Sequence, residues 1–141
     1  MRVRTPFRAV ATLALVAACA AAPGQALEPV FTDPGMATRI DSTSITTDGG
    51  YRIARVTYTL TTPLQMGARP VDGGEDVYIV DCAARTFGFA QRRFMLAGTV
   101  VDERTIPRDA WARTLQPVPA VASAPRAITD RLCDRREGAR P

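Results

Sequence analysis

The stretch Val77–Phe89, VYIVDCAARTFGF, combines a strand pattern with a cysteine and decides the fold. Side chains alternate between the two faces of a strand, so Tyr78, Val80 and Cys82 point to one face. Because two large apolar residues share this face with the cysteine, we expect it to be the covered face of a sheet. The residues that follow predict a returning antiparallel strand.

The expected partner of Cys82 lies near the end of the chain. Of the three cysteines, Cys19 falls in a segment that we expect to be removed or lipidated, which leaves Cys82 and Cys133. Two cysteines in an exported chain most simply pair with each other. Their bond would close a loop of about 50 residues and stabilise the fold by about 4 kcal/mol. The alternatives are two unrelated buried thiols, or a catalytic Cys82 in a chain that has no histidine to activate it.

Residues 1–26 have the pattern of an export signal. A leader with three arginines precedes AVATLALVAACAAA, an apolar segment of 14 residues that is too short to span a bilayer as a stable helix. A small-x-small cleavage site, Gly24-x-Ala26, follows, and cleavage there would discard Cys19. However, Cys19 directly follows Val16-Ala17-Ala18, which resembles a bacterial lipobox. The second alternative is therefore cleavage before Cys19, with a lipid anchor on that cysteine.

Export changes the charge of the chain. Three of the 18 basic residues, Arg2, Arg4 and Arg8, precede Leu27 and none of the 14 acidic residues does, so the mature chain has 15 basic residues against 14 acidic ones. This near-neutral balance argues against a nucleic-acid partner. The mature chain of about 115 residues is long enough for one domain that folds without a metal or another cofactor.

The remaining sequence predicts one domain over residues 37–136, after an extended leader at residues 27–36 and before a frayed tail at residues 137–141. Strands are predicted over residues 36–45, 51–60, 77–82 and 85–98 and from Thr99 onward. The alternation of apolar residues slips at Ile53-Ala54, which predicts a β-bulge. Thr61–Asp76 contains two prolines and three glycines and is predicted to be an exposed loop.

The C-terminal stretch SAPRAITDRLCDRR predicts a short helix. Ser123 suits the N-cap, Pro125 is tolerated in the first turn, and Ile128 and Leu132 lie four apart on one face. The predicted fold is therefore α+β. It is a curved antiparallel sheet of about five or six strands, with the helix packed on one face and tied to it by the bond between Cys82 and Cys133.

Several residues, in their order and spacing, resemble a known family. Asp41 with Ser44-Ile45, the pair Asp81-Cys82, Trp111, and Cys133 at the end of the helix are similar to the surface-adhesin protein E family of bacterial envelope proteins. The resemblance covers Ala37–Cys133. It implies an antiparallel sheet with a disulfide-tied C-terminal helix and an outer-envelope location. For some members it also implies adhesion to extracellular-matrix or plasma proteins of a host.

The residue types do not favour catalysis or metal binding. The chain has neither histidine nor lysine, and its serines have no base in view. Asp72–Asp76, DGGED, is a weak calcium signal that is better explained as an acidic turn. We expect Asp41 and Ser44 to have structural roles and Trp111 to belong to the core.

We therefore expect a non-enzymatic binding module, exported to the periplasm, the outer membrane or the cell surface. It would contact a protein partner through an open sheet face or through Thr61–Asp76, and a membrane only through a lipid on Cys19. The sequence does not identify individual ligand-binding residues. The alternative is a structural or accessory envelope protein, periplasmic or lipid-anchored, without a host ligand.

Overall fold

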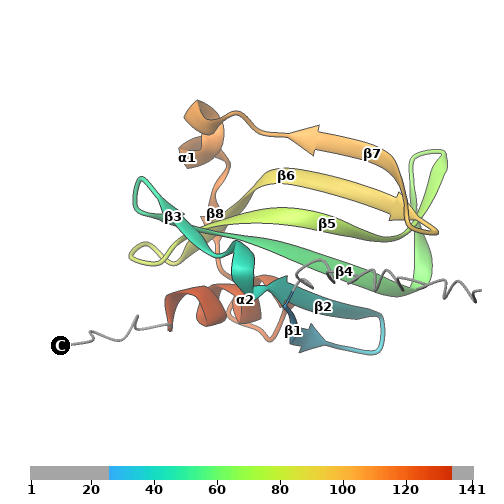
Figure 1. Cartoon of the computed structure of the whole chain (residues 1–141), viewed down its shortest axis with the longest axis horizontal. Coiled ribbons are helices and arrows are strands. Elements are labelled where there is room, and N and C mark those ends of the chain that lie inside the picture. Colours follow the sequence, from blue (N-terminus) through green and yellow to red (C-terminus); the bar gives the residue numbers. More distant parts are fainter. Residues whose placement is uncertain (1–25, 135–141) are drawn as a thin grey trace, which may run out of the picture.

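The computed structural model describes residues 26–134, which form an eight-stranded sheet and a C-terminal helix (Figure 1). The strands are β1 (Leu27–Thr32), β2 (Met36–Asp41), β3 (Thr46–Asp48), β4 (Tyr51–Met66), β5 (Arg69–Asp81), β6 (Thr86–Leu96), β7 (Thr99–Thr105) and β8 (Gln116–Pro117). The helices are the 3-10 turns η1 (Ser42–Ser44) and η2 (Arg108–Ala110), and the α-helices α1 (Trp111–Thr114) and α2 (Ala124–Cys133).

The strands follow one another in space almost as they do in the chain. Their order is β1-β2-β4-β5-β6-β7, while β3 pairs with β4 and β8 pairs with β6. Every pairing is antiparallel, and the sheet is open, with β1 and β7 at its two edges. The predicted antiparallel sheet is confirmed. It has more strands than expected because β1 and the short strands β3 and β8 were not predicted.

The segment expected to be an extended leader contributes an edge strand. Leu27–Thr32 is extended, as predicted, but it pairs with β2, and the register shifts between Pro29 and Phe31. A proline cannot donate to a strand ladder and is therefore tolerated only at an edge or a bulge. Val30 and Phe31 pack against the buried core, which holds this segment in the domain.

The prediction of an exposed loop over Thr61–Asp76 is wrong. This segment is a long hairpin, in which β4 continues to Met66 and β5 begins at Arg69. Pro63 falls where the register between β4 and β5 shifts, between Thr59 and Leu64, so the missing N–H group does not interrupt a regular ladder. The prolines and glycines of this segment therefore mark a bulge and a close approach of strands.

Glycine is required at position 74 by the strand next to it. A Cβ atom there would lie 2.3 Å from the carbonyl oxygen of Arg93 and 2.5 Å from Oη of Tyr58. At Gly73 it would lie 2.6 Å from the carbonyl oxygen of Tyr58. The two glycines thus allow β4, β5 and β6 to approach closely where the sheet bends.

The β-bulge predicted at Ile53-Ala54 is also wrong, because β4 keeps one register with β5 from Arg52 to Thr59. The irregularity lies on the other edge of β4, where η1 separates β2 from β3. The apolar pattern changes because both faces are covered here. Ile53 pairs with the buried Ile79, and Gly88, opposite Ile79, lies against Leu115.

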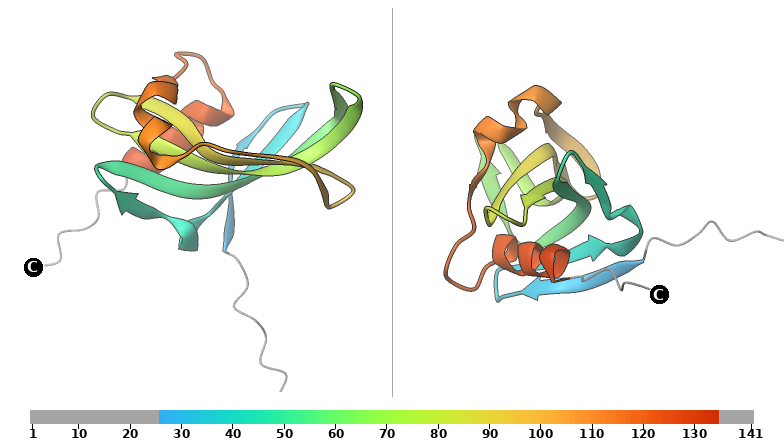
Figure 2. Two further views of the ribbon diagram at one scale, coloured as in Figure 1. Left: turned by 90° about the horizontal axis from the view of Figure 1, so that it is seen from above. Right: turned by 90° about the vertical axis from the view of Figure 1, so that its left-hand side faces the viewer.

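The predicted helix and disulfide are confirmed. The helix α2 begins after Ser123, as expected, although the Ser123 hydroxyl donates to the Val121 carbonyl instead of capping the helix. Cys133 is bonded to Cys82, with 5.5 Å between the two Cα atoms. Ile128 and Leu132 belong to a buried cluster that also includes Ile40, Ala54, Val56, Tyr78, Val80 and Phe87. Figure 2 shows the curl of the sheet, with α2 beside β1.

Candidate binding groove

The sheet face that carries the buried cluster also carries an open groove. Alternate side chains of β4, β5 and β6 point to this face, and beyond the covered part they border a cavity of about 440 Å³. The groove is lined by Met36, Thr38, Val56, Tyr58, Leu60, Leu64, Met66, Val71, Asp76, Tyr78, Phe89, Arg92, Phe94, Arg104, Ala124 and Pro125. Strands β2, β4, β5, β6 and β7 and the first turn of α2 all contribute to it.

Aromatic rings form the boundary between the groove and the core. The ring centroids of Tyr78 and Phe89 are 4.8 Å apart with an interplanar angle of 66°. Phe87 completes the cluster, with its centroid 6.1 Å from that of Tyr78 and 5.9 Å from that of Phe89. Such contacts between aromatic rings add to the stabilisation from burial alone. The side chains on this side of the groove are therefore held in place.

An ion pair crosses the apolar lining. Asp76 and Arg92 are cross-strand partners in β5 and β6, so their side chains meet on the same face. Nε and Nη2 of Arg92 donate to the two carboxylate oxygens of Asp76, each at 3.1 Å. The Arg92 guanidinium also lies 4.1 Å from the centroid of the Phe89 ring. Burial raises the pKa of Asp76, and the hydrogen bonds from Arg92 oppose that rise.

Two tyrosines lie beside this ion pair. Burial raises the pKa of Tyr58 to about 12, and the Asp76 carboxylate adds to the rise. The same two causes raise the pKa of Tyr78. Both phenols therefore stay protonated near neutral pH and remain able to donate a hydrogen bond.

The groove lining contains an unused hydrogen-bonding group. Thr38 of β2 is buried, and its Oγ1 atom has no hydrogen-bond partner within residues 26–134. Most buried polar side-chain atoms in proteins have a partner, and an exception calls for an explanation such as a missing water or ligand.

The apolar part of the groove extends toward the ends of the long hairpins. Leu64, with 59% of its surface exposed, and Met66 lie at this end. A second hollow of about 420 Å³ adjoins the groove and shares four of its lining residues. We call it the distal hollow, and it is lined by Met66, Gly67, Ala68, Arg69, Val71, Phe94, Val101, Asp102 and Arg104. Through these shared residues the two hollows form one depression.

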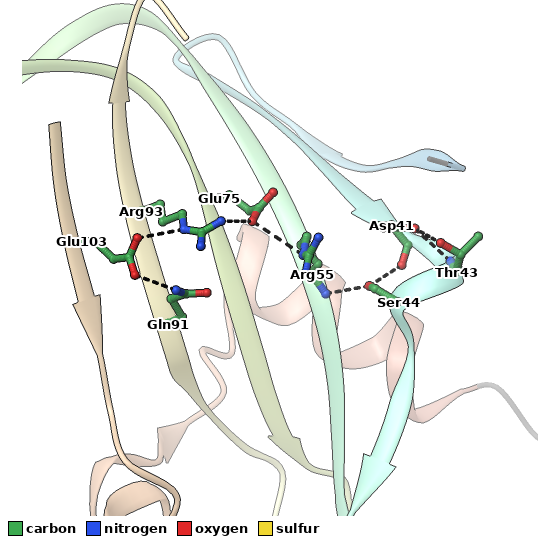
Figure 3. A network of polar contacts seen from close by, with 8 residues as sticks. All are labelled: Asp41, Thr43, Ser44, Arg55, Glu75, Gln91, Arg93 and Glu103. Carbon is green, nitrogen blue, oxygen red and sulfur yellow. Dashed lines mark hydrogen bonds and ion pairs between the residues drawn. The ribbon is translucent and has the colours of Figure 1, made fainter. Parts of the chain in front are cut away.

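The opposite face of the sheet is polar and its charges are paired. Glu75 accepts from Arg93 at 3.3 Å and lies 3.6 Å from Nε of Arg55, while Arg93 donates to Glu103 at 3.0 Å. Gln91 donates to Glu103 at 2.8 Å. Figure 3 shows this polar ladder, which consists of Asp41, Thr43, Ser44, Arg55, Glu75, Gln91, Arg93 and Glu103. Because these side chains form hydrogen bonds and ion pairs with one another, the ladder has few free polar groups for a ligand.

Asp41 and Ser44 form one end of the ladder and organise the backbone. Oδ1 of Asp41 accepts from the Thr43 amide at 3.0 Å. The Ser44 hydroxyl donates to the Asp41 carbonyl at 2.7 Å and accepts from the Arg55 amide at 2.8 Å. Ser44 therefore fills the gap between β2 and β3 along β4, which agrees with the expected structural role.

The other predicted residues lie outside the groove. Trp111 is buried, as expected, and its Nε1 donates to the Ile106 carbonyl at 3.0 Å. Asp81 accepts from the Ala84 amide at 2.9 Å within the turn that holds Cys82. The bonded Cys82 and Cys133 do not line the groove, and Cys19 lies outside the described residues.

The acidic run of β5 is divided between the two faces. Glu75 and Asp76 point to opposite sides, where each pairs with arginine. Among residues 26–134, no group of three or more side chains is arranged to hold a metal ion.

Sequence analysis did not find Tyr58, Asp76 and Arg92 as groove residues. The missed signal is the charge doublet Glu75-Asp76, which stands opposite Arg92-Arg93 in the antiparallel register. Two adjacent charges in each strand place one pair on each face, so one of these ion pairs had to lie on the apolar side.

Comparisons of the chain with protein-family models, with curated proteins and with solved structures found no match in any of the three. The resemblance to the surface-adhesin protein E family therefore stays a prediction from the residues. Within residues 26–134, none of the helices has the length and apolar character needed to cross a membrane.

Proposed function

We propose that this chain is an exported, non-enzymatic binding module of the bacterial cell envelope and that the groove is its binding site. The observation that carries this proposal is the ion pair between the buried Asp76 and the partly exposed Arg92 in an otherwise largely apolar hollow. Sites for small ligands are concave and mostly apolar, with a few placed polar groups that set orientation and specificity. The groove has this composition, whereas the polar ladder on the other face does not.

The covered end of the face would keep the groove in shape. We infer that α2 lies across this end, because Ile128 and Leu132 share a buried cluster with Val56 and Tyr78. Ala124 and Pro125 of α2 also line the groove. The bond between Cys82 and Cys133 fixes the far end of the helix. A site held by rigid elements loses less conformational entropy when a ligand binds.

The groups in the groove suit binding better than catalysis. Both carboxylate oxygens of Asp76 are taken by Arg92, and Tyr58 and Tyr78 have raised pKa values that keep them protonated. No strong base or activated nucleophile results from this arrangement. Export is supported by the signal pattern of residues 1–26 and by the disulfide, which is typical of an oxidising compartment.

Adhesion to a host extracellular-matrix or plasma protein is a second candidate function. It rests on the resemblance and on the open edge of β7, where Val100 has 45% of its surface exposed. An unpaired edge strand can accept a strand from another protein. A structural or accessory role in the envelope, without a host ligand, is the remaining alternative.

The proposed binding site is tested by NMR with the isotope-labelled mature protein and a panel of small compounds. The panel should include anions, cations, neutral polar molecules and apolar molecules. We expect the shift changes to concentrate on Tyr58, Asp76, Phe89 and Arg92 and to leave the polar ladder unaffected. Changes confined to the β7 edge or the polar ladder, or no change with any compound, would overturn the groove as the site.

A parallel assay addresses adhesion. The mature protein is applied to immobilised matrix and plasma proteins, with a variant that carries Val100→Lys on the β7 edge as the comparison. If adhesion uses this edge, the parent binds and the variant loses binding. Adhesion through β7 is contradicted if the parent and the variant bind equally well, or if neither protein binds.

A further inference from the structure

We propose that the groove binds a single-chain amphiphile, with an anionic carboxylate or phosphate head on Arg92 and Arg104 and an alkyl chain along the apolar side chains of Leu60, Leu64 and Met66. This assignment rests on the proposed function, since it names the ligand class of the same site. It follows from the free hydrogen-bond donors, the charge balance and the apolar lining of the groove.

The head-binding group is a guanidinium that is already held in place. Arg92 uses two N–H groups on Asp76 and is stacked on Phe89, so its orientation is fixed before a ligand arrives. Arginine carries five N–H donors, and no further hydrogen bond of Arg92 occurs within residues 26–134. The side chain is about one-third exposed (36%), so the remaining donors are accessible to an acceptor on a ligand. A carboxylate or phosphate matches such donors best.

The charge balance of the depression favours an anion over a cation. Asp76 is neutralised by Arg92, and both of its oxygens are occupied, which leaves no free carboxylate for a cationic head. Arg104 lies 5.5 Å from the centroid of Phe94 and pairs with Asp102 at 3.3 Å. That pair is exposed and therefore contributes little, so Arg104 can turn to a ligand at small cost. Across both hollows three arginines face two aspartates, because Arg69 also lines the distal hollow.

The tail-binding part of the groove is apolar and adaptable. Leu60, Leu64, Met66 and Val71 line it, and Met66 and Val71 continue into the distal hollow. Methionine and leucine side chains adjust to a flexible chain more readily than a rigid aromatic slot does. Each hollow alone, at about 440 and about 420 Å³, lies within the range of small-ligand sites. A groove that has apolar side chains beside two arginines matches an amphiphile.

Direct binding tests this assignment. Decanoate and decyl phosphate, each below the concentration at which it aggregates, are titrated into the mature protein by calorimetry. We expect both to bind, and the stronger of the two identifies the head. Decyltrimethylammonium and acetate, which lack the anionic head and the tail respectively, should bind at least about tenfold more weakly. Equal binding of the cation, or no binding of either anion, would overturn the assignment.

Matched variants locate the two ends of the ligand. Leu64→Ser should weaken decanoate binding about tenfold through lost apolar contact, whereas Val121→Ser, at a residue that is 70% exposed and outside the groove, should leave it unchanged. Arg104→Gln should weaken it about threefold, and Arg113→Gln should not. All four positions are largely exposed or lie in short surface segments, and equal melting temperatures would show that the variants fold. Uniform effects across the four variants would contradict the proposed position of the ligand.

The outcome can be separated from that of the proposed function. If neither anionic amphiphile binds while other compounds shift groove resonances in the NMR experiment, the ligand class is wrong and the groove remains the site. If no compound reaches the groove, both proposals fail together.

Discussion

At the scale of single residues, Asp76 shows how one position can serve both folding and binding. The residue is 2% exposed and lies on the side of the sheet that holds the core. Burying a charge is costly unless it is paired, and Arg92 provides a bidentate partner from the adjacent strand. The pair fixes the guanidinium that would meet a ligand. Its presence on the apolar face could have been inferred from the facing doublets Glu75-Asp76 and Arg92-Arg93, given the strand register.

The raised pKa of Asp76 has a defined effect on stability. The folded protein holds this proton to a higher pH than the unfolded chain does, so the folded state binds more protons in the interval above the ordinary aspartate pKa of 3.8. The contribution of Asp76 to the free energy of unfolding is therefore fully present below that value and is lost as pH rises through the folded pKa. Asp76→Asn should remove this dependence.

The measurement is urea unfolding of the parent and of Asp76→Asn between about pH 3.5 and 7. The free energy of unfolding of the parent minus that of the variant should fall as pH rises across the lower part of this range. If the difference rises instead, Arg92 outweighs burial and the pKa of Asp76 is lowered. Thr47→Ala, on the exposed strand β3, serves as a control whose difference from the parent should not vary with pH.

At the scale of elements, the sequence predicted the parts of the fold that depend on local pattern. The apolar spacing of Ile128 and Leu132 predicted α2, and alternation at Tyr78 and Val80 predicted the core strand. The sequence prediction failed for Thr61–Asp76, where the prolines and glycines were interpreted as signs of a loop. A bulge that accommodates Pro63 and a close strand approach at Gly74 are set by neighbouring strands and cannot be inferred from local composition.

The hairpin formed by β4 and β5 gives a sharp prediction at Gly74. Gly74→Ala should lower the free energy of unfolding by about 3 kcal/mol, since the new methyl group would meet the Arg93 carbonyl and the Tyr58 hydroxyl. Gly35→Ala is the control, because its Cβ would lie 3.5 Å from Oδ1 of Asp33, an ordinary contact. Denaturant unfolding measures both. Equal stability of the two variants would mean that β6 does not approach β5 as described.

At the scale of the whole molecule, long-range contacts determine what the sequence could and could not predict. The crosslink was predictable because only Cys82 and Cys133 remain once residues 1–26 are set aside. The groove was not, because it is assembled from five strands and α2, and its position depends on the register of each pair.

The bond between Cys82 and Cys133 is the feature on which this architecture most depends, and it can be measured directly. Protein expressed from the full-length sequence and purified without reductant is alkylated while denatured, before and after reduction, and its intact mass is determined. We predict no alkylation of Cys82 or Cys133 before reduction and complete alkylation after it. Replacing both cysteines with serine should cost about 4 kcal/mol. The same mass shows whether Cys19 is absent or lipidated. Two freely reactive thiols in unreduced protein, with unchanged stability of the serine variant, would contradict the architecture.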